Sequence, residues 1–136
     1  MQGREPRGKV RPGADYEAVR KDLAAELAEM TDPATGERMV ERVFLREELY
    51  DGPMVTSAPD LVVAALNGFD YKGAVNRPEV TFKGVLNGMH TTYDAHVYAS
   101  GVELRQDNVR IEDVMPSILK TMGIPVPADV DGRLLY

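Results

Sequence analysis

The feature that most constrains the fold is a short apolar run without alternating polar residues. It follows Pro59-Asp60, extends over Leu61–Leu66 and ends at Asn67-Gly68. An apolar run of this length, bounded by turn residues, is typical of a central strand that is buried on both faces. Such strands usually lie under helices, so the run favours a layered arrangement.

The segments around this run alternate between helix and strand patterns. Apolar residues recur at three- and four-residue steps from Tyr16 to Met30, which predicts a helix with Asp15 as its N-cap. Alternation predicts a strand over 38–46, after turn residues at 32–36. The remaining expectations are a loop or arm over 1–13, an irregular loop over 67–78 (a lid or a plain connector), a strand over 93–99, a turn at Asp107-Asn108, and a helix over 111–122 that has Pro116 in its first turn and ends at Gly123.

This order of elements predicts an α/β fold with a small mixed sheet flanked by helices. The 136 residues fit one compact domain over 1–136. Only three or four strands and two long helices are expected, which is a thin sheet for a free-standing domain. Because an open sheet edge gains burial most easily by pairing, we expect a dimer or a swapped assembly in isolation.

Composition excludes several classes of function. The net charge of −6, with the basic residues scattered among acids, argues against a nucleic-acid or anionic-membrane surface. The sequence has no cysteine, and therefore no disulfide framework, thiolate nucleophile or Cys-ligated zinc. No apolar run approaches the roughly 20 residues that span a bilayer. The first residues do not resemble a signal peptide, so we expect a cytoplasmic location.

Candidate catalytic residues are few. A serine triad would need Ser57, Ser100 or Ser117 beside His90 or His96, and no Gly-x-Ser-x-Gly elbow occurs. We therefore assign no catalytic residue, and the sequence also lacks a phosphate-binding glycine loop.

The histidines are candidate metal ligands of unequal interest. An extended strand would separate them by about 20 Å, so they are not expected to share one ion. Gly88 allows a tight bend before His90, which makes His90 either a metal ligand or a solvent-exposed loop residue. His96 fits a strand histidine whose ring is either hydrogen-bonded or at the surface. The acids are expected in structural roles, Asp60 as a strand-entry cap and Asp129 and Asp131 as turn formers.

Several motifs together resemble a known family. In chain order they are Gly3-Arg4-Glu5-Pro6, Asp32-Pro33-x-Thr35-Gly36-Glu37, Pro59-Asp60-Leu61, Gly88-x-His90, Asp113-x-x-Pro116-x-Ile118-Leu119 and Gly123-x-Pro125-x-Pro127-x-Asp129-x-Asp131-Gly132-Arg133-x-Leu135. Their order resembles the C-terminal part of type I phosphodiesterase/nucleotide pyrophosphatase proteins of the alkaline phosphatase superfamily. The resemblance covers nearly the whole chain.

The resemblance implies a partial alkaline-phosphatase-like layered fold and a metal-dependent hydrolase of phosphate esters. In that family two divalent metals, zinc foremost, are held by Asp and His residues, and a Thr or Ser attacks phosphorus. The Gly-x-His histidine is one ligand, which carries over to His90. Family members usually place an acid three residues after it, whereas Asp94 lies four after His90. The nucleophile and other ligands are expected before Met1.

Three functions follow from this interpretation. The first is a hydrolase segment that contributes His90, binds metal weakly or not at all, and is inactive without the missing N-terminal part of its domain. The second is a non-catalytic structural or interaction module derived from that fold. The third is a segment of a metal-dependent phosphoglycerate mutase-like enzyme of the same superfamily.

Overall fold

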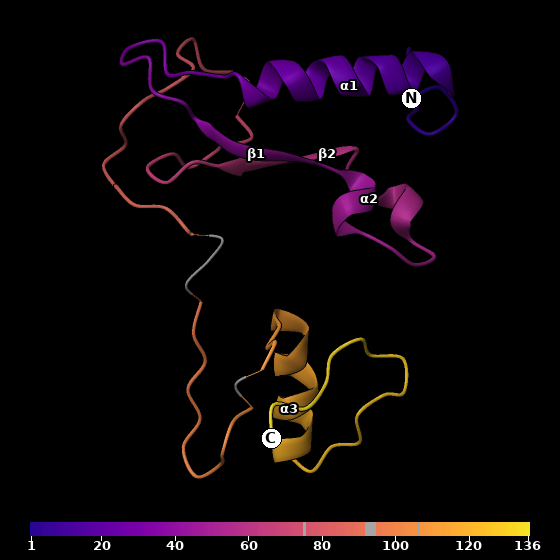
Figure 1. Cartoon of the computed structure of the whole chain (residues 1–136), viewed down its shortest axis with the longest axis vertical. Helices are drawn as coiled ribbons and strands as arrows, with labels where there is room; N and C mark the ends of the chain where they lie inside the picture. The colour runs from indigo at the N-terminus through magenta and orange to yellow at the C-terminus, as the bar shows by residue number, and fades with distance from the viewer. Residues whose placement is uncertain (75, 92–94, 106) are drawn as a thin grey trace. The chain divides into compact units, whose positions relative to one another are not determined.

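The computed structural model describes residues 1–74, 76–91, 95–105 and 107–136. The chain divides into two compact units, Met1–Asp94 and Ala95–Tyr136, and each is described by itself (Figure 1). The expectation of one domain over 1–136 stays a prediction.

The first unit begins with an arm and a long helix. Residues 1–13 contain turns but no helix or strand, as predicted, and the Gln2 amide donates to the Val10 carbonyl at 2.7 Å. Helix α1 spans Ala14–Ala28 and its N-cap is Gly13. The prediction of Asp15 as N-cap was wrong. Asp15 lies inside the first turn, where its carboxylate accepts a hydrogen bond from Arg11 Nε at 2.5 Å.

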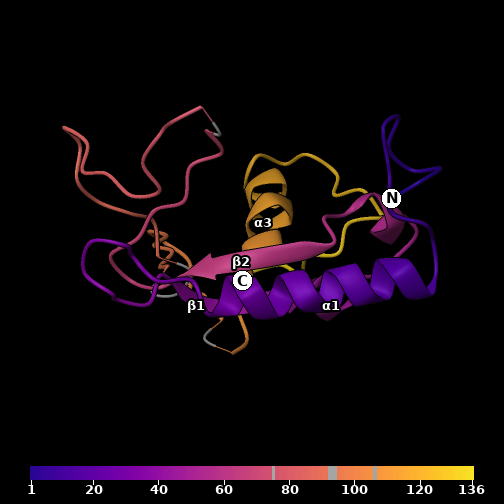
Figure 2. The ribbon, with the colours of Figure 1, turned by 90° about the horizontal axis from the view of Figure 1, so that it is seen from above.

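Two strands form the sheet of the first unit. Strand β1 (Val40–Leu45) pairs antiparallel with β2 (Leu61–Ala65), with an irregularity between Val40 and Arg42. Both strands confirm their predictions from sequence. Helix α1 runs along the strands and packs against both of them (Figures 1 and 2).

Short helical turns connect the two strands. Helix α2 (Arg46–Leu49) begins directly after β1, where the Glu48 carboxylate accepts from the Leu45 amide at 2.6 Å. The 3-10 turn η1 (Val55–Ser57) precedes β2. This local bond to Glu48 ends β1 one residue before the predicted boundary, because Arg46 already belongs to α2.

Few apolar side chains are buried. Among the described residues, the buried hydrophobic ones are Met39, Val40 and Leu135. All five residues of β2 are only partly buried, so the prediction of a strand buried on both faces was wrong. The reason is that the described two-stranded sheet packs against one long helix, α1, and a single helix cannot cover both of its faces.

The segment after β2 is irregular, as predicted for 67–78. No described residue from 67 to 91 lies in a helix or strand. Side chains anchor this segment to the start of the sheet and to the preceding turn. The Tyr71 hydroxyl donates to the Met39 carbonyl at 2.6 Å, and Thr81 Oγ1 donates to Asp32 Oδ1 at 2.9 Å.

The second unit is built around one helix. A 3-10 turn, η2 (Ile111–Asp113), leads into α3 (Val114–Thr121), which confirms the helix and places Pro116 in its first turn. Gly123, at a positive φ of 69°, ends the helix as predicted. The Ile124 amide then donates to the Leu119 carbonyl at 2.9 Å, a bond typical of a helix that ends with a left-handed glycine.

The predicted strand over 93–99 is not formed by residues 95–99, while 93 and 94 lie outside the described residues. A strand needs a hydrogen-bonded partner, and the described sheet contains only β1 and β2. The bend at Asp107-Asn108 is present, with Asn108 at a positive φ of 45°. Taken together, the described elements form a mixed α/β structure whose sheet is antiparallel rather than mixed.

Candidate functional site

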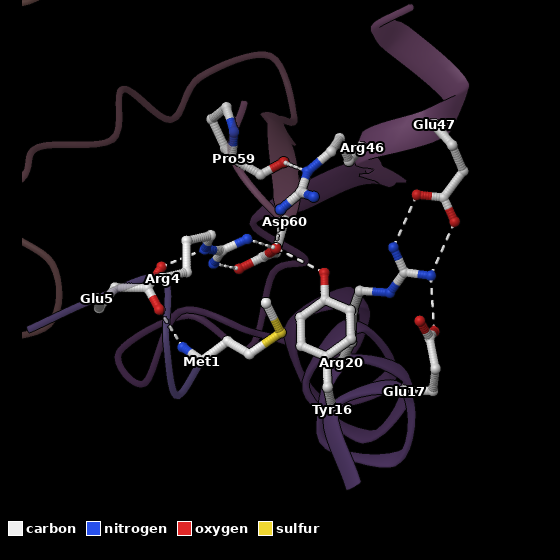
Figure 3. Close-up of polar contacts among 10 residues, drawn as sticks. All are labelled: Met1, Arg4, Glu5, Tyr16, Glu17, Arg20, Arg46, Glu47, Pro59 and Asp60. Atoms are coloured by element: carbon white, nitrogen blue, oxygen red, sulfur yellow. Dashed lines mark hydrogen bonds and ion pairs between the residues drawn. The ribbon is translucent and has the colours of Figure 1, made fainter. Parts of the chain in front are cut away.

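A cluster of polar side chains around Asp60 joins the arm, α1 and α2 to the start of β2 in the first unit (Figure 3). Arg4, from the arm, donates Nη1 to Asp60 Oδ1 at 2.6 Å and Nη2 to Oδ2. The Tyr16 hydroxyl, from α1, donates to Oδ1 at 2.6 Å, and Arg46 Nη2, from α2, donates to the same oxygen. Asp60 precedes β2 as expected, but its carboxylate binds these side chains instead of capping the strand.

The electrostatics of the cluster fix its protonation states. The hydrogen bond from the Arg4 guanidinium holds the pKa of Asp60 well below its usual range, against the opposing effect of burial. The same bond raises the pKa of Arg4. Burial, and then the hydrogen bond to Asp60, raise the pKa of Tyr16. Asp60 is therefore ionised at neutral pH, and its oxygens are occupied by donors from the protein.

A second set of ion pairs surrounds this cluster (Figure 3). Glu5 accepts from Arg4 Nε and from the N-terminal amine of Met1. On the other side, Arg20 of α1 donates to both oxygens of Glu47 in α2, at 2.7 and 2.8 Å. These contacts tie the arm to itself and α1 to α2.

An open cavity of about 590 Å³ lies beside the cluster. Its lining includes Arg4, Glu5, Thr56, Ser57, Pro59 and Asp60. The charged side chains in this lining, Arg4, Glu5 and Asp60, form ion pairs with one another. Its uncharged polar side chains are the hydroxyls of Thr56 and Ser57. Neither histidine lines the cavity, so Ser57 has no imidazole there to act as its general base.

His90, the predicted metal ligand, is exposed on the irregular segment. Gly88, two residues before it, has a positive φ of 148°, but residues 87–90 form neither a turn nor a bend, so the predicted tight bend is not present there. The intervening Met89 is anchored, because its Sδ accepts from the Gly68 amide at 2.8 Å. Within the described residues no group of three or more His, Cys, Asp or Glu side chains could hold a metal ion. Asp94 lies outside the described residues, and the assignment of His90 stays a prediction.

The other candidates from the sequence are not brought together into a site. His96 is exposed in the second unit, as expected of a surface histidine. Asp129 lies in a turn, in agreement with its predicted role, whereas Asp131 is exposed on the irregular tail. Ser117 is buried, and its Oγ is occupied by main-chain groups.

In the second unit a buried acid and Ser117 hold the C-terminal tail against α3. Asp113 is 2% exposed, and its Oδ1 accepts from the Arg133 amide at 2.7 Å. Ser117 Oγ donates to the Asp113 carbonyl at 2.6 Å and accepts from the Leu135 amide at 2.8 Å. These bonds satisfy buried main-chain groups, so Asp113 and Ser117 have structural roles here.

Arg4, Tyr16 and Arg46 were not predicted as members of a cluster. A weak signal was present, because Arg4 and Asp60 both belong to motifs of the family resemblance. Nothing in the spacing of residues 56 positions apart indicated that they pair.

Comparison with known proteins adds no assignment: no protein-family model, curated protein or solved structure matches this chain. In the described part of the chain, none of the helices has the length and apolar character needed to cross a membrane.

Proposed function

We propose that this chain is the C-terminal segment of a metal-dependent phosphodiesterase- or phosphatase-type hydrolase domain of the alkaline phosphatase superfamily. It contributes His90 as one ligand of a divalent metal, zinc foremost. The nucleophile and the other ligands come from a preceding segment, so the chain alone does not turn over a phosphate ester. A phosphoglycerate mutase-like enzyme of the same superfamily would use the segment in the same way.

The observation that carries this proposal is the amount of apolar surface left uncovered. Among the described residues, three hydrophobic side chains are buried: Met39, Val40 and Leu135. By contrast, β2 is apolar throughout and only partly buried, and Val19 and Leu23 of α1 are 49% and 45% exposed. Ordering a chain costs about 1–2 kcal/mol per residue, which burial must offset. Further protein that covers these surfaces would supply that burial.

The exposed position of His90 is compatible with its imidazole binding a metal ion that other residues hold on the opposite side. Its side chain is exposed, while the preceding residue is anchored through Met89 Sδ to Gly68. An exposed imidazole next to an anchored residue can bind a metal that is mainly held by another segment. A two-metal site stabilises the attacking and leaving oxygens together, so a single imidazole cannot carry out the reaction.

Zinc titration followed by NMR tests the ligand role. The chain has two histidines, so variants His90→Ala and His96→Ala assign both imidazoles. We expect the His90 resonances to shift at lower Zn²⁺ concentration than those of His96, its exposed control. Equal shifts would contradict a ligand role for His90.

A hydrolysis assay tests the proposed division of the active site. Hydrolysis of bis(p-nitrophenyl) phosphate by the chain alone, with added Zn²⁺, should be at background. Turnover by the chain alone would contradict the proposal.

A second candidate is an interaction module without catalysis. One observation favours it: β2 presents an uncharged edge that is unpaired in the described sheet. Such edges are sites at which proteins add a strand from another chain. For this candidate His90 and His96 should respond alike to zinc.

A further inference from the structure

One edge of β2 has no neighbouring strand in the described part of the chain, and its main-chain groups follow a definite pattern. The Asp60 carbonyl accepts from the Arg46 amide at 3.1 Å, and the Leu66 amide donates to the Met39 carbonyl at 2.8 Å. Even-numbered residues of this strand therefore direct their main-chain groups toward β1. Because these groups alternate between the two edges of a strand, Leu61, Val63 and Ala65 direct theirs toward the open edge.

The two strands differ in how they are protected from association. β1 contains the charged residues Glu41 and Arg42, and both are exposed. β2 contains only Leu, Val and Ala, with no charge and no proline. Charged residues and proline are the usual means by which proteins block an edge strand. The edge of β2 has neither, and it is therefore the edge suited to accept another strand.

We propose that β2 pairs antiparallel with β2 of a second copy of this chain, across a twofold axis at Val63. This gives a four-stranded sheet in the order β1-β2-β2-β1. The proposal does not depend on the hydrolase function. In this register the main-chain groups of Val63 face their symmetry mates, and Leu61 faces Ala65 of the other copy. All of these residues direct their groups to the open edge, so about six hydrogen bonds form.

In the same register, the side chains of β2 in one copy are complementary in size to those of β2 in the other copy. Leu61 lies opposite Ala65, Val62 lies opposite Ala64, and Val63 lies opposite its own copy. Each larger side chain therefore faces a smaller one, and Val63 faces its equal. A twofold axis at Val62 or Ala64 would also form bonded pairs, Leu61 with Val63 or Val63 with Ala65, but only two such pairs would lie within β2 instead of three. In an isologous interface the same patch of both copies must be complementary to itself. The self-complementarity of β2 therefore favours a second copy of this chain as the partner at the open edge.

Apolar surface continues from this edge onto α1. Leu61 lines an open groove of about 110 Å³ together with Tyr16, Val19 and Leu23 of the helix. Val19 and Leu23 are about half exposed there. Pairing at β2 would place the same groove of each copy on the same face of the four-stranded sheet, where these side chains gain cover.

Disulfide trapping tests the register, because the chain has no cysteine of its own. Two Cα atoms of a hydrogen-bonded antiparallel pair lie about 5.5 Å apart, within the span of a disulfide. Val63→Cys should therefore form a covalent dimer under mild oxidation. Leu61→Cys alone should not, since its two copies would be about 13 Å apart. An equal mixture of Leu61→Cys and Ala65→Cys should form the mixed dimer.

Oligomeric state provides the second test. The unmodified chain should have twice its monomer mass of 15.0 kDa by light scattering at micromolar concentration. Val63→Pro removes an amide that β1 does not use, and it should give a monomer with an unchanged far-UV circular dichroism spectrum.

A monomeric unmodified chain would overturn the proposal. So would a dimer in which Val63→Cys crosslinks no faster than Leu61→Cys, since that dimer would use another surface, as in a swapped assembly. If Val63→Pro does not fold, the contrast between the two cysteine variants still decides the question.

Discussion

The main chain at Gly132 packs directly against the carbonyl group of Glu112, so that a Cβ atom at Gly132 would lie 1.9 Å from that oxygen. This close approach brings the C-terminal tail beside α3, where the next residue, Arg133, donates its amide to Asp113. Position 132 requires glycine for steric reasons, because any side chain would overlap main-chain atoms of Glu112 and Asp113 that cannot move independently.

Gly132→Ala should detach the tail from α3. Overpacking of this kind typically costs about 1–3 kcal/mol, so the Leu135 amide should exchange its hydrogen at least several-fold faster than in the unmodified chain. Gly73→Ala is the matched control, because a Cβ at Gly73 meets nothing within 4 Å. Unchanged exchange at Leu135 in Gly132→Ala would show that the tail can move without loss of its bonds.

Ser117→Ala should weaken the same attachment by a different route. The change leaves the Leu135 amide without its 2.8 Å acceptor in a buried position. An unsatisfied buried donor costs about 1–3 kcal/mol. We expect faster exchange at Leu135 while α3 keeps its helical signal, as measured by NMR. Ser100→Ala, at an exposed position, serves as the control, and equal effects of the two changes would contradict the role of Ser117.

Local patterns in the sequence predicted the elements that depend on local bonds. The helix that ends at Gly123 was correct because its end is closed by main-chain bonds within a few residues, such as that from Ile124 to Leu119. The irregular arm was likewise indicated by its own glycines and prolines.

Features that depend on distant segments could not be predicted in this way. The sequence predicted a strand over 93–99, but a strand forms only where a partner supplies bonds, and none is described for residues 95–99. The pairing of Arg4 with Asp60 joins residues 56 positions apart, which no local pattern encodes. The burial expected of β2 failed for the same reason, because it depends on neighbours beyond the two described strands.

Asp60→Asn should release the arm from the start of β2. The substitution removes the charge that binds Arg4 and Arg46, and hydrogen bonds to charged groups contribute about 1.5–3 kcal/mol. Trypsin should then cleave after Arg7 and Lys9 several-fold faster, which mass spectrometry can follow.

Asp70→Asn is the control for this change, because Asp70 pairs only with its near neighbour Lys72 in the described structure. Equal cleavage rates in the two variants would show that Asp60 does not hold the arm in place.

Acid should release the arm in the unmodified chain. The pKa of Asp60 is lowered in the folded state, chiefly by the hydrogen bond from Arg4, from an ordinary value of 3.8. A carboxyl with a lowered folded pKa stabilises the fold fully above its unfolded value, and this contribution is lost as the pH falls toward the folded pKa. The arm should therefore stay attached from neutral pH down to about pH 4 and detach progressively below it.

NMR shifts of the arm amides, such as that of Gln2, measure this transition. Glu5, within the arm, also has a lowered pKa, chiefly through its bond to the N-terminal amine, so acid acts on Glu5 as well as on Asp60. Asp60→Asn separates them, because only the Glu5 contribution remains in that variant. If the unmodified chain and Asp60→Asn showed the same transition, the shifts would report the contacts of Glu5 within the arm, and Asp60 would not hold the arm in place.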